Sequence, residues 1–396
     1  MVLTTSRSSP NRKGLTTVVD TDRMICQTPL PGERVLHTVG ETVSVRLELD
    51  SVLDGKAYLR TNLGNATALW REIIEEVEDS IPPSGAGWQD LPMTRVNDRA
   101  FEITVALKEP GRFEAKAFFM PQGSDIPMWP SEKENLVIKV LPECAGSRLC
   151  IYQAFVRLFG ESGTLADLEE MLDLIIDEMG FRVLMLLPTF PIASGDETRG
   201  RSFASPFATL NYFQIEPALA SRDDPLEEFH GLVESIHRKG AMLWLDIPIN
   251  HTGWGSRLQG EHPEWFCRDE NGDFVSPGAW GVTWDDLVKL DFKYRDLWRY
   301  LADVFVFWCR LGVDGFRCDA GHMIPVEVWR YIVAKVRFEY PATIFFLEGL
   351  GGSWEVNTRI LDEAGIDLVY SELFQKPTSH EIHDHLQWCG QLNDTI

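Results

Sequence analysis

Two acidic residues follow apolar runs in a pattern that suits acid and base chemistry. Asp319 stands two positions after Arg317 at the end of one run, and Glu348 ends the run at 343–347. Side chains alternate along a strand, so Arg317 and Asp319 share a face, where the guanidinium keeps the carboxylate charged. The apolar surroundings of Glu348 instead predict a raised pKa and a bound proton. One ionised and one protonated carboxyl group are the pair that glycosidic bond cleavage requires.

Polar residues also follow a third apolar run, at 242–249. Asp246 lies within this run, and Asn250 and His251 come directly after it. A single acidic residue after a strand is most often a helix cap or a solvated loop residue. Several such groups at the carboxyl ends of neighbouring parallel strands favour a shared site, because catalytic groups of an α/β barrel collect at that end.

The spacing of apolar residues after position 150 indicates buried strands that alternate with amphipathic helices. The expected strands are 151–159, 181–187, 242–249, 313–318, 343–347 and 366–370. The expected helices are 165–179, 225–239, 295–311, 326–338, 354–363 and one that begins after 377. This alternation predicts an α/β fold of the (β/α)8 TIM-barrel type, truncated after about six βα units. The predicted barrel domain covers 150–396, with an inserted loop subdomain at about 250–293.

The N-terminal part has a different rhythm. Residues 1–30 contain no apolar signal core and are predicted to form a disordered or frayed tail. Residues 31–141 contain short alternating runs divided by turn residues, which predict an antiparallel β-sandwich of the immunoglobulin or fibronectin kind. Its expected strands are 43–49, 57–61, 101–106, 113–119 and 136–140. For 70–78, helix and strand both remain open.

Composition excludes some partners. The chain of 396 residues has a formal charge of -23, which argues against nucleic acid and anionic membranes and favours solubility. Its 7 cysteines are scattered and lack a Cys-x-x-Cys pair, so neither a disulfide framework nor a zinc site is indicated. Reduced thiols and the absence of a membrane-length apolar run favour a cytoplasmic protein.

Residues 150–375 resemble the α-amylase superfamily of retaining glycoside hydrolases and transglycosidases, glycoside hydrolase family 13. The first short region of that family, Asp-x-x-x-Asn-His, is matched at 246–251, and the second, Gly-x-Arg-x-Asp, at 315–319. The third region, a glutamate at a strand end, is matched by Glu348. The segment 205–212 is similar to the family segment after strand two.

The resemblance implies a role for each matched residue. Asp319 would be the nucleophile that forms a covalent glycosyl-enzyme, and Glu348 the acid and then the base, with their carboxyl groups roughly 5 Å apart. Arg317 would align Asp319. Asp246 and His251 would hold hydroxyl groups of the sugar at the cleavage position.

Other positions match the family less closely. Phe207 stands where a stacking tyrosine is usual, and His322 is expected to contact substrate. Asn250 could ligate a structural calcium ion, as is frequent in the family, or cap a loop; no cofactor is otherwise required. The inserted loop holds aromatic residues that could stack on sugars or simply pack: Trp254, Trp265, Phe266, Trp280 and Trp284.

The fourth region of the family is a His-Asp pair after strand seven. The dipeptide at 383–384 falls within a predicted helix, so this third catalytic aspartate is expected beyond residue 396.

Within the superfamily, the residues after Asp319 and Glu348 look like those of bacterial enzymes of glycogen and maltodextrin metabolism. The resemblance implies action on α-1,4 or α-1,6 bonds of glycogen or maltooligosaccharides. The alternative is a non-catalytic or inactive glucan-binding protein or fragment that lacks the last barrel strands. Hydrolysis or transfer, linkage and oligomeric state are left open.

Overall fold

The N-terminal part of the chain forms two β-sheets. The computed structural model describes residues 25–146, 149–193 and 205–392. One sheet has the strand order β1-β3-β7-β6 and the other β2-β9-β8-β4-β5. The strands are β1 (Ile25–Thr28), β2 (Arg34–Thr38), β3 (Thr42–Leu49), β4 (Gly55–Thr61), β5 (Gln89–Pro92), β6 (Thr94–Arg95), β7 (Ala100–Ala106), β8 (Gly111–Pro121) and β9 (Leu136–Leu141).

Alternation of apolar and polar residues explains how these strands form a core. Every second residue of β3 is buried, and the inner faces of both sheets contribute to a single hydrophobic cluster. All predicted strands of this part exist. The pairing is not wholly antiparallel, however, because β2 runs parallel to β9. The immunoglobulin or fibronectin topology stays a prediction.

The range predicted as a tail, 1–30, is partly structured. Strand β1 pairs with β3, and the buried Gln27 fixes it in place. The side-chain oxygen of Gln27 accepts from the Ala117 backbone N–H at 2.7 Å, and its side-chain nitrogen donates to the Pro29 carbonyl at 2.9 Å. The bond to Ala117 joins residues far apart in the chain and cannot be predicted from local composition. Residues 1–24 lie outside the described residues.

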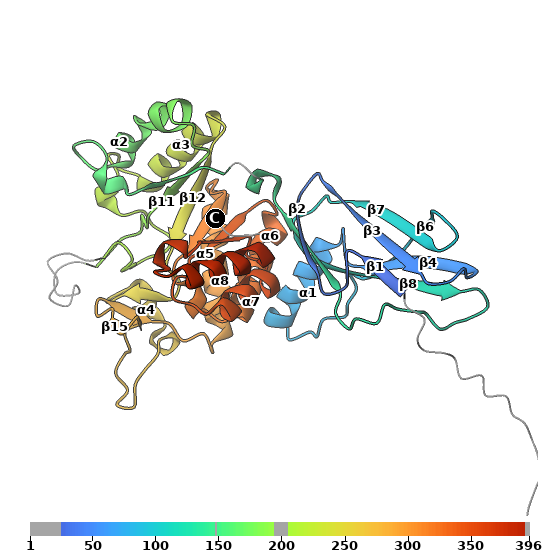
Figure 1. Ribbon diagram of the computed structural model, residues 1–396. Helices are drawn as coiled ribbons and strands as arrows, with labels where there is room; N and C mark the ends of the chain where they lie inside the picture. The colour runs from blue at the N-terminus through green and yellow to red at the C-terminus, as the bar shows by residue number, and fades with distance from the viewer. Residues whose placement is uncertain (1–24, 147–148, 194–204, 393–396) are drawn as a thin grey trace, which may run out of the picture.

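The segment left open between helix and strand is helical. Helix α1 (Ala66–Glu78) lies between the N-terminal sheets and the α/β part (Figure 1). Arg295 and Arg299 donate to carbonyl groups of its last turn, with the Arg299–Glu78 bond at 2.7 Å. Cations at a helix C-terminus complement both the unpaired carbonyls and the helix dipole.

The second half of the chain contains a parallel sheet of 6 strands in the order β10-β11-β12-β17-β18-β19. The strands are β10 (Ile151–Ala154), β11 (Val183–Leu186), β12 (Met242–Ile247), β17 (Gly315–Cys318), β18 (Ile344–Leu347) and β19 (Leu368–Val369). The helices are α2 (Leu165–Glu169), η3 (Asp173–Glu178), α3 (Pro225–Arg238), α5 (Arg295–Arg310), α6 (Val326–Glu339), α7 (Trp354–Glu363) and α8 (Ser379–Leu392). The six predicted βα units are therefore present, in sequential order across the sheet.

Two predicted elements are interrupted. The strand expected at 151–159 ends at Ala154 and is followed by a short turn, η2 (Val156–Leu158). The helix expected at 165–179 begins with a Thr164–Asp167 capping box but continues as the π-helical η3. Periodicity alone does not reveal such a change of helix type.

The inserted segment at about 250–293 contains short elements. These are β13 (His251–Gly253), α4 (Arg257–Glu261), η6 (Pro263–Trp265), β14 (Gly278–Ala279), β15 (Val282–Thr283) and β16 (Leu287–Lys289). The remaining short turns are η1 (Glu143–Ala145), η5 (Pro217–Leu219), η7 (Gly321–Met323) and η8 (Leu373–Gln375). Within the described ranges, no helix has the length and apolar character that a membrane span needs.

Candidate active site

The register of the parallel sheet brings the predicted catalytic residues to one face. Asp246 of β12 lies opposite Arg317 of β17, and Arg317 lies opposite Phe346 of β18. Because side chains alternate, Asp319 and Glu348, each two residues further on, continue that same face. The structure thus places all four polar groups at the carboxyl ends of three adjacent strands.

A glycine makes room for this arrangement beneath the site. The inward-facing Trp244 packs against Phe346, with ring centroids 6.0 Å apart. A Cβ atom at Gly315, on the neighbouring strand, would lie 2.7 Å from the indole nitrogen of Trp244. The glycine that opens the Gly-Phe-Arg-Cys-Asp motif is therefore required by packing below the carboxylates.

Arg317 joins two carboxylates. Its Nη1 donates to both oxygens of Asp246 at 2.8 Å and to Oδ1 of Asp319 at 2.7 Å. The Asp246 side chain is fully buried, whereas 14% of the Asp319 side chain is exposed. The predicted contact between Arg317 and Asp319 is confirmed. The bridge to Asp246 was not predicted, because it depends on the register between strands.

Burial and charge act on this cluster in opposite directions. Burial raises the pKa of Asp246, and the Arg317 guanidinium lowers it, while the charge of Asp319 raises it again. Burial lowers the pKa of Arg317, but the two aspartates raise it by more, so the guanidinium stays charged. A charged arginine held between two carboxyl groups fixes the position of the exposed one.

Glu348 is tied to the turn that follows Asp319. Its Oε2 accepts from the Ala320 backbone N–H at 2.8 Å, and its Oε1 accepts from the Leu350 N–H at 2.9 Å. Ala320 has a left-handed backbone, with φ of 45°, which is uncommon for a residue with a Cβ atom. The strained turn therefore aims a donor at Glu348 directly after the residue predicted to be the nucleophile.

The environment of Glu348 favours its protonated form. Burial raises the pKa of this carboxyl group, the nearby charge of Asp319 raises it further, and Arg317 opposes both. The direction predicted from the apolar run is confirmed. Only 7% of the Glu348 residue is exposed.

These groups line one pocket of about 330 Å³. Its wall is formed by Ser205, Phe207, His251, Ala279, Trp280, Trp284, Asp286, Leu287, Arg317, Asp319, Ala320, His322, Glu348 and Leu350. Phe207 faces Arg317, with the guanidinium carbon 5.9 Å from the ring centroid. An apolar wall with a few convergent polar groups is typical of a small-molecule site.

His251 is buried beside the carboxylates. Burial lowers its pKa, although the charge of Asp319 raises it, so the imidazole is neutral at pH 7. Apart from an interaction with the Phe207 backbone, neither ring nitrogen has a hydrogen-bond partner among the described residues. A buried ring with an unpartnered nitrogen at a pocket wall is suited to bind a ligand hydroxyl group.

Tyr212 fixes the backbone around His251. Its hydroxyl group donates toward the carbonyl oxygens of Pro248, at 2.9 Å, and His251, at 2.7 Å. The sequence singled out the Asn211-Tyr212 pair only by resemblance. Its supporting position behind the pocket became visible only in the fold.

His322 lies in η7, on the Glu348 side of the pocket. Burial lowers its pKa, and apart from an interaction of the ring with the Glu348 backbone, its buried Nδ1 atom has no hydrogen-bond partner among the residues that the structure describes. His322, His251, Phe207, Arg317 and both predicted catalytic carboxylates are thus brought to one cavity. Asp246 lies behind Arg317 and does not line it.

Asn250 lies apart from this cavity. Its amide nitrogen donates to the Met323 sulfur at 3.3 Å, and its oxygen has no partner within the described ranges. Those ranges contain no group of three or more His, Cys, Asp or Glu residues that could hold a metal. Calcium takes about six to eight oxygen ligands, and the Asn250 side chain could supply one of them. Calcium binding there stays a prediction, and no chemical step depends on it.

The sequence pointed to Trp280 as one of the loop aromatics that could stack on sugars, but it did not reveal Asp286, Leu287 or Leu350 as lining residues. Asp286 and Leu287 come from the inserted loop, and Leu350 follows Glu348. The chain near Asp286 is held by Trp254, whose indole donates to the Asp285 carbonyl at 2.8 Å. Loop residues have no periodic signal, so only the folded loop could reveal them.

The fold and the site together define a class. A parallel α/β sheet of barrel type places an acid with a raised pKa beside an arginine-bound carboxylate at adjacent strand ends. This is the arrangement expected of a glycoside-cleaving enzyme.

Comparison with known families agrees. A family model described as "Alpha amylase, catalytic domain" matches residues 131–341, more than half of the chain. The chain belongs to the α-amylase family, whose members are glycoside hydrolases and transglycosidases. The predicted superfamily is therefore confirmed.

Individual relatives match this chain at low identity and over only part of their length. A protein of Rhodospirillum rubrum named alpha-1,4-glucan:maltose-1-phosphate maltosyltransferase is 30% identical over 247 residues, which are 58% of this chain and 34% of that protein. A protein of Cereibacter sphaeroides with the same name is 28% identical over 269 residues, 63% of this chain and 39% of that protein. This chain spans little more than a third of either relative.

Solved structures show the same family. An α-amylase from Lactobacillus plantarum is 28% identical, with a TM-score of 0.53 over 63% of this chain and 60% of that one. A maltogenic α-amylase from Thermotoga neapolitana is 26% identical, with a TM-score of 0.50 over 62% and 56%. Both likenesses support the α/β fold of barrel type.

Proposed function

We propose that the protein is a retaining glycosidase or transglycosidase that acts on α-1,4 or α-1,6 glucosidic bonds of glycogen or maltodextrins. One observation carries this proposal. Asp319 and Glu348 line the same pocket, and Arg317 binds the first while the backbone of Ala320 binds the second. An ionised nucleophile and a protonated acid on one cavity are what the double displacement requires.

The reaction would proceed in two displacements. An oxygen of Asp319 attacks the anomeric carbon, the bond to the leaving oxygen breaks, and Glu348 gives that oxygen its proton. Glu348, now a carboxylate, then takes the proton from water or a sugar hydroxyl, whose oxygen attacks the anomeric carbon and releases Asp319. Each displacement inverts the centre, so the overall result is retention.

The other residues would bind and orient the sugar. The imidazoles of His251 and His322 lie at the cavity wall, where ring nitrogens can bind hydroxyl groups. Phe207 offers an apolar face for a sugar ring. Asp246 would act through Arg317, to which both its oxygens are bonded.

The names of the relatives include both transfer and hydrolysis, so transfer to a sugar acceptor is one outcome that this chemistry allows. The two bacterial proteins above are named for maltosyl transfer to an α-1,4-glucan, and the two solved structures are amylases. The prediction of an α-glucan partner and a cytoplasmic location is part of this proposal.

Trapping of the covalent intermediate tests the proposal. The chain is mixed with α-maltosyl fluoride, whose fluoride leaves without help from an acid, and its intact mass is measured after rapid quenching. We expect a maltosyl adduct in the wild type and none in Asp319→Asn, because an amide is a poor nucleophile. In Glu348→Gln the adduct should accumulate, since the base for the second step is missing.

The same experiment addresses the alternative function. A wild-type chain that binds maltoheptaose but never forms the adduct, and releases no fluoride, would be a glucan-binding protein without catalysis. Products from maltoheptaose and from a branched glucan would then distinguish hydrolysis from transfer in an active chain.

A further inference from the structure

Trp280 occupies an unusual place at the rim of the active-site pocket. Trp280 and Gly281 form the two-residue turn between β14 and β15, and both have positive φ angles, 52° and 75°. Such turns favour asparagine, aspartate or glycine at the first position. Trp280 is nevertheless a tryptophan, and 68% of it is exposed. A large ring held outward on a strained turn contributes little to the core of the protein.

The indole of Trp280 lies against the loop that follows Glu348. A Cβ atom at Gly351 would be 2.8 Å from the indole nitrogen, and one at Gly352 would be 2.7 Å from the Cβ of His322. The loop thus passes between Trp280 and His322 only because it has no side chains there. Its first residues also reach Glu348, since the Leu350 N–H donates to the carboxyl group.

The role of Glu348 indicates which part of the substrate lies on this side of the pocket. The acid gives its proton to the leaving oxygen, so the residues beside Glu348 face the leaving group in the first step and the acceptor in the second. Trp280, Leu350 and His322 all line the cavity on that side. An exposed indole can stack on the apolar face of a sugar ring.

We propose that Trp280 is the platform on which the glucose unit of the leaving group or acceptor stacks, with the imidazole of His322, across the 349–352 loop, available to a hydroxyl group of the same unit. This inference rests on the proposed function. It makes Trp280 a specificity residue for the acceptor, positioned by the glycines of the 349–352 loop.

The test separates the two halves of the reaction. Wild type, Trp280→Ala and Trp280→Phe are given α-maltosyl fluoride, and fluoride release is measured in water alone and with rising maltohexaose. We expect Trp280→Ala to raise the KM for maltohexaose ~10-fold, the effect of losing one well-placed aromatic contact. Fluoride release in water should change far less, because fluoride needs no platform. Trp280→Phe should recover most of the acceptor affinity.

A matched variant controls for loss of an exposed tryptophan in general. Trp88 is 37% exposed and belongs to the N-terminal part, so Trp88→Ala should leave the KM for maltohexaose unchanged. An unchanged KM in Trp280→Ala overturns the inference. Equal losses in water and with maltohexaose also overturn it, because they would mean that the indole only supports the Glu348 loop.

Failure of the proposed function would look different. If the wild type releases no fluoride, catalysis is absent, and binding of maltohexaose is then measured by calorimetry on the same proteins. Weaker binding in Trp280→Ala than in Trp88→Ala would still support the platform, and equal binding would overturn it.

Discussion

At the scale of single residues, Glu348 is the group whose protonation the structure controls most directly. Its burial and the charge of Asp319 raise its pKa, while backbone N–H groups of Ala320 and Leu350 hold its orientation. The acid form therefore persists to a higher pH than in a free carboxyl group. Since the first displacement uses that form, the rate of cleavage should fall as pH rises through the raised pKa.

Glu348→Gln tests this assignment. We expect cleavage of maltoheptaose to fall by ~10²–10⁴-fold, the usual contribution of a positioned acid. The descending alkaline limb of the pH–rate profile should disappear with it. Initial rates across pH, for wild type and variant, provide the measurement.

Glu355→Gln is the matched control for this experiment, because Glu355 is an exposed acid on α7, outside the pocket. It should retain both the rate and the alkaline limb. An alkaline limb that survives in Glu348→Gln would assign the limb to another group and contradict the role of Glu348 as the acid.

The sequence predicted the chemistry of this site better than its geometry. The alternation rule was enough to pair Arg317 with Asp319, and the apolar run was enough for the pKa direction of Glu348. The bridge to Asp246 needed the register between β12 and β17. The strained turn at Ala320 and the position of the loop residue Trp280 needed a backbone that local patterns do not specify.

At the scale of elements, helix α1 connects the N-terminal sheets to the α/β part. Glu78, its last residue, accepts from the Tyr331 hydroxyl at 2.7 Å and from the Lys335 ammonium at 2.8 Å, both on α6. Burial raises the pKa of Glu78, but these two hydrogen bonds and the charges of Lys335 and Arg299 together lower it by more, so its net pKa lies below the usual value of 4.5. The charged form is therefore the one that stabilises the docking of α1.

Glu78→Gln tests the contribution of this charge. A carboxyl group with a lowered folded pKa contributes stability above its unfolded pKa and loses it as pH falls through the folded pKa. At pH 7 we expect the free energy of unfolding to decrease by ~1–3 kcal/mol, the cost of losing hydrogen bonds to a charged group. The difference from wild type should shrink below pH 4, where Glu78 itself becomes neutral.

Urea unfolding at pH 7 and at several acidic pH values gives the measurement. Glu75→Gln, on the same helix, is the control, because no hydrogen bond of its side chain is found among the described residues. A stability difference for Glu78→Gln that is independent of pH would mean that shape, not charge, fixes the helix.

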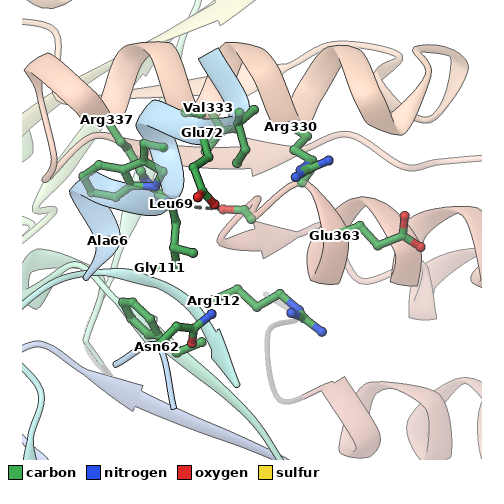
Figure 2. A pocket seen from close by; sticks show the side chains of 16 residues that line it. Asn62, Ala66, Leu69, Glu72, Gly111, Arg112, Arg330, Val333, Arg337 and Glu363 are labelled. Carbon is green, nitrogen blue, oxygen red and sulfur yellow. Dashed lines mark hydrogen bonds between the residues drawn. The ribbon is translucent and has the colours of Figure 1, made fainter. Parts of the chain in front are cut away.

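At the scale of the whole molecule, the sequence predicted the secondary-structure elements of both parts but not the contacts between the parts. Amphipathic periods located both sets of elements, and the six βα units appear in the expected order. The junction depends on contacts between residues far apart in the chain, such as Arg34 with Asp362 at 2.8 Å. A pocket of about 170 Å³ remains within it, where Arg112 of β8 and Arg330 of α6 approach from opposite sides (Figure 2).

Lys139 is a buried residue of this junction that connects both parts of the chain. It lies on β9, is 2% exposed, and donates to the carbonyl oxygens of Ile366, at 2.6 Å, and Asp367, at 3.1 Å. The carboxyl group of Asp367 in turn binds Arg337 and accepts from the Phe345 N–H at 2.8 Å. A strand of the N-terminal part is thus connected through two residues to β18, the strand that Glu348 directly follows.

Lys139→Met should therefore weaken the junction and loosen the support of the site. Methionine keeps most of the volume but leaves the carbonyl groups without their charged donor, so we expect the free energy of unfolding to fall by ~1–3 kcal/mol. Lys133→Met, which removes an exposed lysine from the same part, should leave it unchanged. Urea unfolding measured by tryptophan fluorescence and by far-ultraviolet circular dichroism tests this. The carbonyl groups lie at the boundary between the parts, so in Lys139→Met the fluorescence and circular dichroism transitions should occur at different urea concentrations. Transitions that coincide at the wild-type midpoint would show that other contacts join the parts.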